Sequence, residues 1–140
     1  MVTPRRRHKE RQQELSDETI FVFGSNLSGR HGRGTALRAR EYYGAVSGKG
    51  IGLQGASYAI PTKDHALRGL PLEQIAHYVS RFIEFAREHT EMTFQVTRVG
   101  CGMAGYSDEK MAPLFTGVPK NCQMPEEWKP FLQKVKGGKK

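Results

Sequence analysis

The chain has 140 residues, of which 37% are hydrophobic and 26% are charged, and it contains 16 glycines. This length and composition are typical of one globular domain that buries enough surface to fold without disulfides. No apolar run approaches the roughly 18 residues of a membrane-spanning helix, so we expect no membrane partner. The N-terminus also lacks the apolar stretch of a secretory signal, so the sequence predicts a cytoplasmic protein.

The formal net charge of +8 is concentrated at the two ends of the chain. Residues 1–11 carry +4 and residues 129–140 carry +5, whereas the 117 residues between them carry −1. Basic tails attract polyanions, which makes a nucleic-acid partner one hypothesis; solvated ends that aid solubility are the other. We therefore divide the chain into a basic, polar arm over 1–18, a domain over 19–132 and a basic tail over 133–140.

Hydrophobic patterning predicts an alternation of strands and helices. The clearest element is a helix over 72–89, where apolar residues recur at i, i+3, i+4 and i+7. In chain order we expect a strand over 19–23, a glycine loop over 24–34, a helix over 35–43, an irregular stretch over 47–56, a strand over 57–61 closed by Pro61, the helix over 72–89, a strand over 92–99, a glycine loop over 100–106 and a short helix over 108–115 capped by Ser107. This order predicts an α/β domain with helices packed against a sheet.

Both glycine loops follow predicted strands and precede predicted helices. Ligands of α/β sheets bind at the carboxyl ends of strands, and a helix N-terminus offers unpaired N–H groups to an anion. Two such loops facing one another favour binding of a phosphate or diphosphate, while plain tight turns are the alternative for either loop alone.

Two common nucleotide motifs are excluded by the residues present. After the glycine spacing of Gly24 and Gly29, Arg30 and His31 stand where a P-loop requires Lys and Ser or Thr. Gly100-Cys-Gly102-Met-Ala-Gly105 lacks the following strand and acid of a dinucleotide fold. The two cysteines and five histidines show no zinc spacing. We therefore expect no cofactor and no metal.

The glycine loops resemble those of a known family. Phe23-Gly24-Ser25-Asn26, followed by further glycines and a helix, resembles the first ligand loop of macrodomains, and the segment 99–106 resembles their second loop, Gly-x-Gly-x-x-Gly-Tyr/Phe. The segment 57–63 resembles small macrodomain-like proteins of bacteria and phages. The resemblance covers roughly residues 19–116 and implies a three-layer α/β/α fold with a mixed sheet and a shortened C-terminal part.

The resemblance also implies a ligand and a set of site residues. Macrodomains bind ADP-ribose and related nucleotides, and some hydrolyse ADP-ribosyl linkages. Asn26 matches the asparagine that contacts the distal ribose and helps to place water in hydrolases, and His31 interrupts the usual glycine run as a candidate acid or base. The implied ligand-binding residues are Gly24, Ser25, Gly32, Arg33 and Gly34 in the first loop, and Gly100, Cys101, Gly102, Met103, Ala104, Gly105 and Tyr106 in the second.

Three functions follow as hypotheses. One is binding of ADP-ribose or a related nucleotide diphosphate in a cleft between the two loops, with hydrolysis of an ADP-ribosyl linkage there as a possible activity. The second is a non-catalytic module that binds a nucleotide signal in the same cleft, and the third is a nucleic-acid-binding protein that uses its basic tails. Within the second loop, Cys101 is either a nucleophile activated by a helix N-terminus or a small buried residue.

Overall fold

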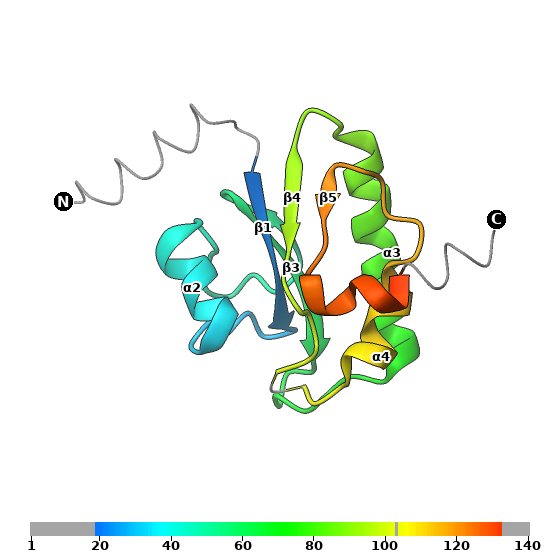
Figure 1. Ribbon diagram of the computed structural model, residues 1–140. Coiled ribbons are helices and arrows are strands. Elements are labelled where there is room, and N and C mark those ends of the chain that lie inside the picture. The colour runs from blue at the N-terminus through cyan, green and yellow to red at the C-terminus, as the bar shows by residue number, and fades with distance from the viewer. Residues whose placement is uncertain (1–18, 103, 133–140) are drawn as a thin grey trace.

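The computed structural model describes residues 19–102 and 104–132. The predicted arm over 1–18, the predicted tail over 133–140 and the predicted ligand contact Met103 lie outside the described residues. The elements are β1 (Thr19–Asn26), α2 (Gly34–Tyr42), β2 (Gly52–Gln54), β3 (Ser57–Lys63), α3 (Leu72–Glu88), β4 (Thr93–Val96), α4 (Asp108–Met111), the 3-10 helix η1 (Ala112–Phe115), β5 (Cys122–Gln123) and the 3-10 helix η2 (Glu126–Trp128) (Figure 1).

The five strands form one mixed sheet in the order β2-β3-β1-β4-β5. The central strand β1 runs parallel to β3 and to β4, β5 runs parallel to β4, and β2 is antiparallel to β3. The predicted α/β class and mixed sheet are thereby confirmed. Among the described residues, no helix has the length and apolar character needed to cross a bilayer.

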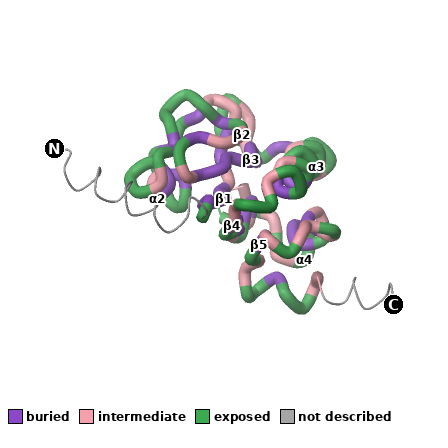
Figure 2. The backbone as a smooth tube through the Cα atoms, turned by 90° about the horizontal axis from the view of Figure 1, so that it is seen from above, coloured by how far each residue is buried: buried purple, intermediate pink, exposed green. Residues whose placement is uncertain are grey.

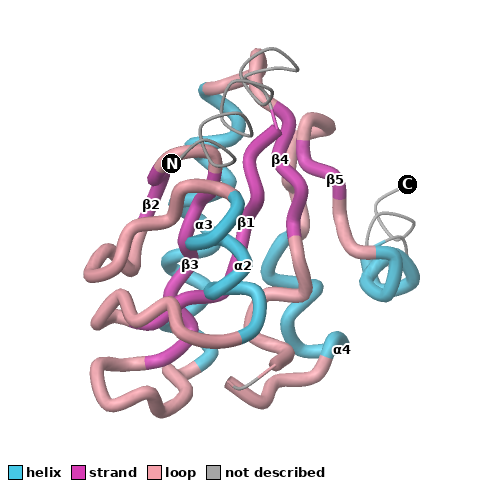
Figure 3. Tube along the Cα trace, turned by 90° about the vertical axis from the view of Figure 1, so that its left-hand side faces the viewer, coloured by secondary structure: helices cyan, strands magenta, loops and turns pink. Residues whose placement is uncertain are grey.

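Helices lie on both faces of this sheet, and β1 supplies side chains to each face. Because side chains alternate along a strand, Ile20 and Val22 enter the core beneath α3 and α4, whereas Phe21 and Phe23 enter a smaller core beneath α2. Figure 2 shows α2 on one side of the strands and α3 with α4 on the other, and Figure 3 shows α2 in front of the sheet. The continuous apolar run of β1 is therefore explained by burial on both faces.

Helix α3 confirms the predicted amphipathic helix. Its buried side chains fall on one stripe, made by Ile75, Val79, Phe82, Ile83 and Ala86. Pro71 precedes the helix in an extended conformation, and the helix ends one residue earlier than predicted.

Several predicted boundaries are wrong, and pairing partners explain the differences. Strand β1 continues to Asn26 because its end pairs with the end of β3, and β3 passes Pro61 to end at Lys63. The proline is tolerated because β2 pairs only with residues 57–59 and so leaves Pro61 without a partner in β2. Strand β4 ends at Val96 instead of Val99. The short strands β2 and β5 were not predicted, since two or three residues show no periodicity.

Candidate functional site

Three parallel strands end at the same edge of the sheet, and a loop leaves each of them. The first glycine loop follows β1, a short loop over 64–70 follows β3, and the second glycine loop follows β4. A cavity of about 810 Å³ opens between these three loops and the start of α2. The residues that line it are Gly24, Asn26, Arg30, Gly32, Arg33, Gly34, Thr35, Ala36, Thr62, Lys63, Leu67, Arg98, Val99, Gly100, Cys101, Gly102 and Ala104.

The cavity brings together most of the residues predicted from the two glycine loops. From the first loop, Gly24, Asn26, Gly32, Arg33 and Gly34 line it, and from the second loop Gly100, Cys101, Gly102 and Ala104 line it. Four predicted residues that the structure describes do not line it: Ser25, His31, Gly105 and Tyr106. The cleft between the loops is thus present, with a third wall, from the loop after β3, that the sequence analysis left open.

The side chain of Asn26 holds its own loop in place. It is buried, and its Oδ1 accepts hydrogen bonds from the Arg30 amide at 2.8 Å and from Ser28 Oγ at 3.0 Å. Its Nδ2 donates to the Arg30 carbonyl at 2.9 Å. These three bonds close the turn over residues 26–30 and direct the amide of Asn26 toward the protein backbone.

A second segment, residues 46–50, braces the first loop from beneath. Ser25 Oγ donates to the Gly50 carbonyl, and the buried ring of His31 places Nε2 3.0 Å from the Lys49 carbonyl. Because a carbonyl oxygen only accepts, Nε2 carries the hydrogen. The same ring packs edge-on against Phe23 with centroids 5.3 Å apart. Ser25 and His31 therefore position the loop, and a catalytic role for His31 stays a prediction.

Two glycines are required where the segment 46–50 packs against the first loop, one in each of the two segments. A Cβ atom on Gly50 would lie 2.0 Å from the Asn26 carbonyl oxygen, and one on Gly29 would lie 2.3 Å from the Gly48 carbonyl carbon. By contrast, a Cβ atom on Gly32 or Gly102 would have no atom within 4 Å. The glycines of the loops thus divide into those that allow two backbone segments to touch and those that border open space at the cavity.

The N-terminus of α2 borders the cavity. Arg33 is the N-cap residue, in an extended conformation, and its side chain makes no capping hydrogen bond. The next three residues, Gly34, Thr35 and Ala36, all line the cavity. An α-helix leaves its first amides unpaired, and their partial positive charge stabilises an anion.

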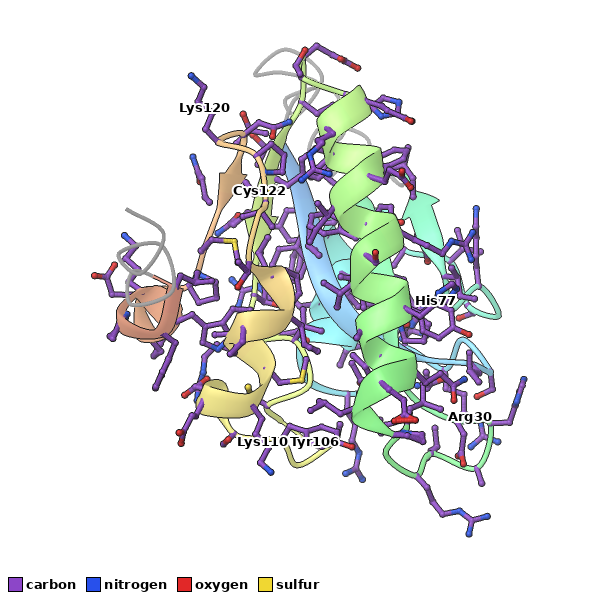
Figure 4. The ribbon with its side chains drawn as sticks, turned by 90° about the vertical axis from the view of Figure 1, so that its right-hand side faces the viewer. Arg30, His77, Tyr106, Lys110, Lys120 and Cys122 are labelled. Carbon is purple, nitrogen blue, oxygen red and sulfur yellow. The ribbon has the colours of Figure 1, made fainter. Side chains whose placement is uncertain are left out.

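The lining side chains carry positive charge only. Arg30, Arg33, Lys63 and Arg98 line the cavity, and no described lining residue is acidic. Within the described part of the chain, Arg98 pairs with Asp108, and no ion pair engages the other three. In Figure 4, Arg30 lies at the same end of the molecule as Tyr106, with Lys120 at the opposite end. The described lining is therefore positively charged.

Asp108, at the start of α4, organises the wall of the second loop. Its carboxylate accepts two hydrogen bonds from the Arg98 guanidinium, at 2.9 and 2.8 Å, and one from Trp128 Nε1 at 2.7 Å. The Arg98 hydrogen bonds lower the pKa of Asp108 to about 2, aided by the bonds from Trp128 and Cys101. Ser107 Oγ accepts from the Lys110 amide, which confirms the predicted N-cap.

The same carboxylate settles the state of the neighbouring thiol. Cys101 Sγ donates to Asp108 Oδ1 at 3.3 Å. Burial, and after it the neighbouring Asp108 carboxylate, together raise the pKa of Cys101 to about 11. Since the thiolate is the nucleophile, Cys101 is a neutral thiol near pH 7 and the helix-activated alternative is disfavoured.

Tyr106 fixes the second loop to the loop that follows β3. Its hydroxyl donates to the Leu70 carbonyl at 2.7 Å, just before α3 begins. The hydroxyl thus connects two of the loops that border the cavity, and a contact of Tyr106 with a ligand stays a prediction. The lining also contains residues that were not predicted to belong to the site, among them Arg30, Thr62, Lys63, Leu67 and Arg98. Thr62, Lys63 and Leu67 come from the end of β3 and the loop after it, a segment without a glycine-rich motif.

Comparison with known proteins adds no assignment: no family model, no curated protein and no solved structure matches the chain. Among the described residues, no group of three His, Cys, Asp or Glu side chains lies close enough together to hold a metal ion.

Proposed function

We propose that the cavity binds ADP-ribose or a related nucleotide diphosphate. The observation that carries the proposal is the charge of the lining. Three basic side chains that are in no described ion pair (Arg30, Arg33 and Lys63) and the N-terminus of α2 border the cavity, and no described lining residue is acidic. A diphosphate carries negative charge that these groups match.

The size and position of the cavity support the same ligand class. Small-molecule and cofactor pockets typically measure 300–1,000 Å³, and this cavity of about 810 Å³ falls within that range. It lies where parallel strands end beside the central strand, the usual place for nucleotides in α/β sheets. The open space at Gly102 leaves the second loop accessible to a phosphate.

We further propose that the domain is macrodomain-like, with α2 as one outer layer and α3 with α4 as the other. The two cores on opposite faces of the sheet support this arrangement. The two-residue strand β5 supports the shortened C-terminal part that the resemblance implies.

Binding is favoured over hydrolysis as the function of the cavity. The described lining residues include no His, Asp or Glu that would act as an acid or base near neutral pH, and the side-chain amide of Asn26 is engaged by its own loop. Hydrolysis of an ADP-ribosyl linkage therefore stands as the second candidate, with Asn26 the one predicted catalytic residue that lines the cavity.

Calorimetric titration with ADP-ribose, with AMP and NAD as comparison ligands, tests the proposal. ADP-ribose should bind to the wild-type protein, and Gly102→Glu should weaken binding at least tenfold because it adds a carboxylate beside the phosphates. Gly102→Gln is the matched control, since it adds the same bulk without charge into open space. Folded wild-type protein that gives no heat with any of the three ligands would contradict the proposal.

A second pair of variants tests the role of the basic lining. Arg33→Met should weaken ADP-ribose binding. Arg38→Met should not, because Arg38 is an exposed arginine of α2 that does not line the cavity.

The rival nucleic-acid hypothesis predicts a steep salt dependence of polynucleotide binding that disappears when residues 1–11 and 129–140 are removed.

A further inference from the structure

The loop after β3 holds one leucine in an unfavourable backbone conformation. Leu67 has a φ of 65° and is the single non-glycine residue with positive φ in the described ranges 19–102 and 104–132. This region of backbone angles favours glycine and is costly for a leucine because its Cβ atom crowds the backbone. The leucine at this position is therefore explained by its side chain or its neighbours, because its backbone conformation disfavours it.

Hydrogen bonds around Asp64 hold the loop in this conformation. Asp64 Oδ1 accepts from the amides of Ala66 and Arg68, both at 2.9 Å, and the Asp64 amide donates to the Arg68 carbonyl at 2.8 Å. The Leu67 amide itself donates to the Asp64 carbonyl at 2.9 Å. The loop is thus a closed turn whose backbone is fixed from several sides.

The leucine side chain is not used by either hydrophobic core. It is 39% exposed and belongs to neither the core beneath α3 nor the core beneath α2. It does line the cavity. Of the large hydrophobic side chains that are exposed in the described chain, Leu67 is the one that does so.

Contacts between loops fix Leu67 relative to the proposed phosphate site. Lys63 bridges to Gly69 on the far side of the turn, and a Cβ atom on Gly69 would lie 3.1 Å from the Ala104 carbonyl of the second glycine loop. The Tyr106 hydroxyl donates a hydrogen bond to the carbonyl of Leu70, the residue after Gly69. The loop that carries Leu67 is therefore fixed against the second glycine loop, and residues of both loops line the cavity.

We propose that Leu67 is a specificity-determining residue that packs against a ring of the bound nucleotide. The inference rests on the proposed function and extends it from the phosphates to the organic part of the ligand. Basic side chains and helix amides account for the charge of a diphosphate, but they give no apolar surface to the face of a sugar or base ring. Leu67 supplies that surface, and burying it on binding offsets the cost of its backbone conformation.

Leu67→Asn and Leu67→Gly test the proposal, because both residues accept positive φ more readily than leucine. Affinity should be measured by calorimetry for ADP-ribose and ADP, and by displacement of ADP-ribose for inorganic pyrophosphate. Both variants should bind ADP-ribose about tenfold more weakly, with pyrophosphate binding unchanged and a Tm equal to or above that of the wild type. Ala66→Asn, one residue earlier and outside the lining, is the matched control and should bind normally.

Comparing the two nucleotides distinguishes the two possible rings. An equal loss for ADP and ADP-ribose assigns the contact to the adenosine part, whereas a loss for ADP-ribose alone assigns it to the distal ribose. Unchanged ADP-ribose affinity in both variants, an equal loss for pyrophosphate, or a Tm several degrees lower would each overturn the proposal. Failure of the wild-type protein to bind any of the three ligands would instead overturn the proposed function, and this inference with it.

Discussion

Trp128 Nε1 lies 2.7 Å from Asp108 Oδ1, and the other oxygen of that carboxylate lies 2.8 Å from Arg98 Nη2. The indole belongs to η2, near the end of the described chain, whereas Arg98 lines the cavity. A single carboxylate therefore connects the C-terminal segment to the wall of the binding site. Its charge matters because both neighbours donate hydrogen bonds to it.

The Asp108 contacts predict an acid-dependent loss of stability. The lowered pKa of Asp108, about 2 against an ordinary value of 3.8, means that its contribution is complete above about pH 4 and is lost as the pH falls toward 2. Asp108→Asn should lower the free energy of unfolding at pH 7 by about 1–3 kcal/mol, as expected for a lost charged hydrogen-bond partner. Thermal unfolding between pH 2 and pH 7 should show a flatter profile for the variant.

A surface ion pair provides the control for that experiment. Glu126 and Lys129 lie 3.3 Å apart, but the glutamate side chain is 85% exposed. Glu126→Gln should therefore change stability by less than about 0.5 kcal/mol. Parallel acid profiles for the wild type and Asp108→Asn would show that this carboxylate is not responsible.

We expect the side chain of Asn26 to stabilise the fold through the bonds that hold its turn. Asn26→Ala removes all three side-chain bonds of the turn and should cost about 1–3 kcal/mol of unfolding free energy, measured in urea. Ser28→Ala removes only one of the three bonds, so it should cost less. Equal stability of Asn26→Ala and the wild type would contradict the role assigned to these bonds.

The glycines of the first loop should respond in two different ways. Gly50→Ala places a methyl group 2.0 Å from the Asn26 carbonyl oxygen, so the two backbone segments must separate at a cost of about 3 kcal/mol. Gly32→Ala meets no atom within 4 Å and should stay within about 0.5 kcal/mol of the wild type. Urea unfolding of both variants checks the difference, and similar stabilities would contradict the close packing.

Cys101 should react slowly with iodoacetamide. With a pKa of about 11 against an ordinary value of 9.0, the thiolate fraction at pH 7.5 is roughly 100-fold below that of an ordinary cysteine. Mass spectrometry should follow labelling of the folded protein, with the same protein in urea as the control in which both cysteines react. Labelling of Cys101 at the rate of a free thiol would show that its surroundings do not suppress ionisation.

Elements with strong periodicity were predictable from the sequence, and short ones were not. The buried stripe of α3 repeats over about three turns, and β1 contains the unbroken apolar run 20–23, so both were expected. Strands β2 and β5 are held by their neighbours instead of by any pattern of their own. The end of β1 was misplaced because Gly24 resembles a loop residue until its partner Ile60 is known.

The candidate site was partly predictable for the same reason. Glycine loops that follow parallel strands meet at one edge of a sheet, which brings the two loops together without further information. His31 was expected at the ligand because it lies among glycines, but its position depends on Lys49, 18 residues away. Asp108 and Trp128 are 20 residues apart, and the backbone angle of Leu67 leaves no trace in the residue type. Long-range contacts and local strain are thus the parts that the sequence did not show.

The central position of β1 also sets an order for folding during synthesis. This apolar strand is complete at residue 26, yet its neighbours β3 and β4 end only at residues 63 and 96. A nascent chain therefore carries β1 with both hydrogen-bonding edges open until residue 63 has been added, and with the edge that pairs with β4 open until residue 96. Such an open apolar strand readily pairs with other chains, so ribosome-bound fragments that stop before β4 should be the most aggregation-prone forms of this protein.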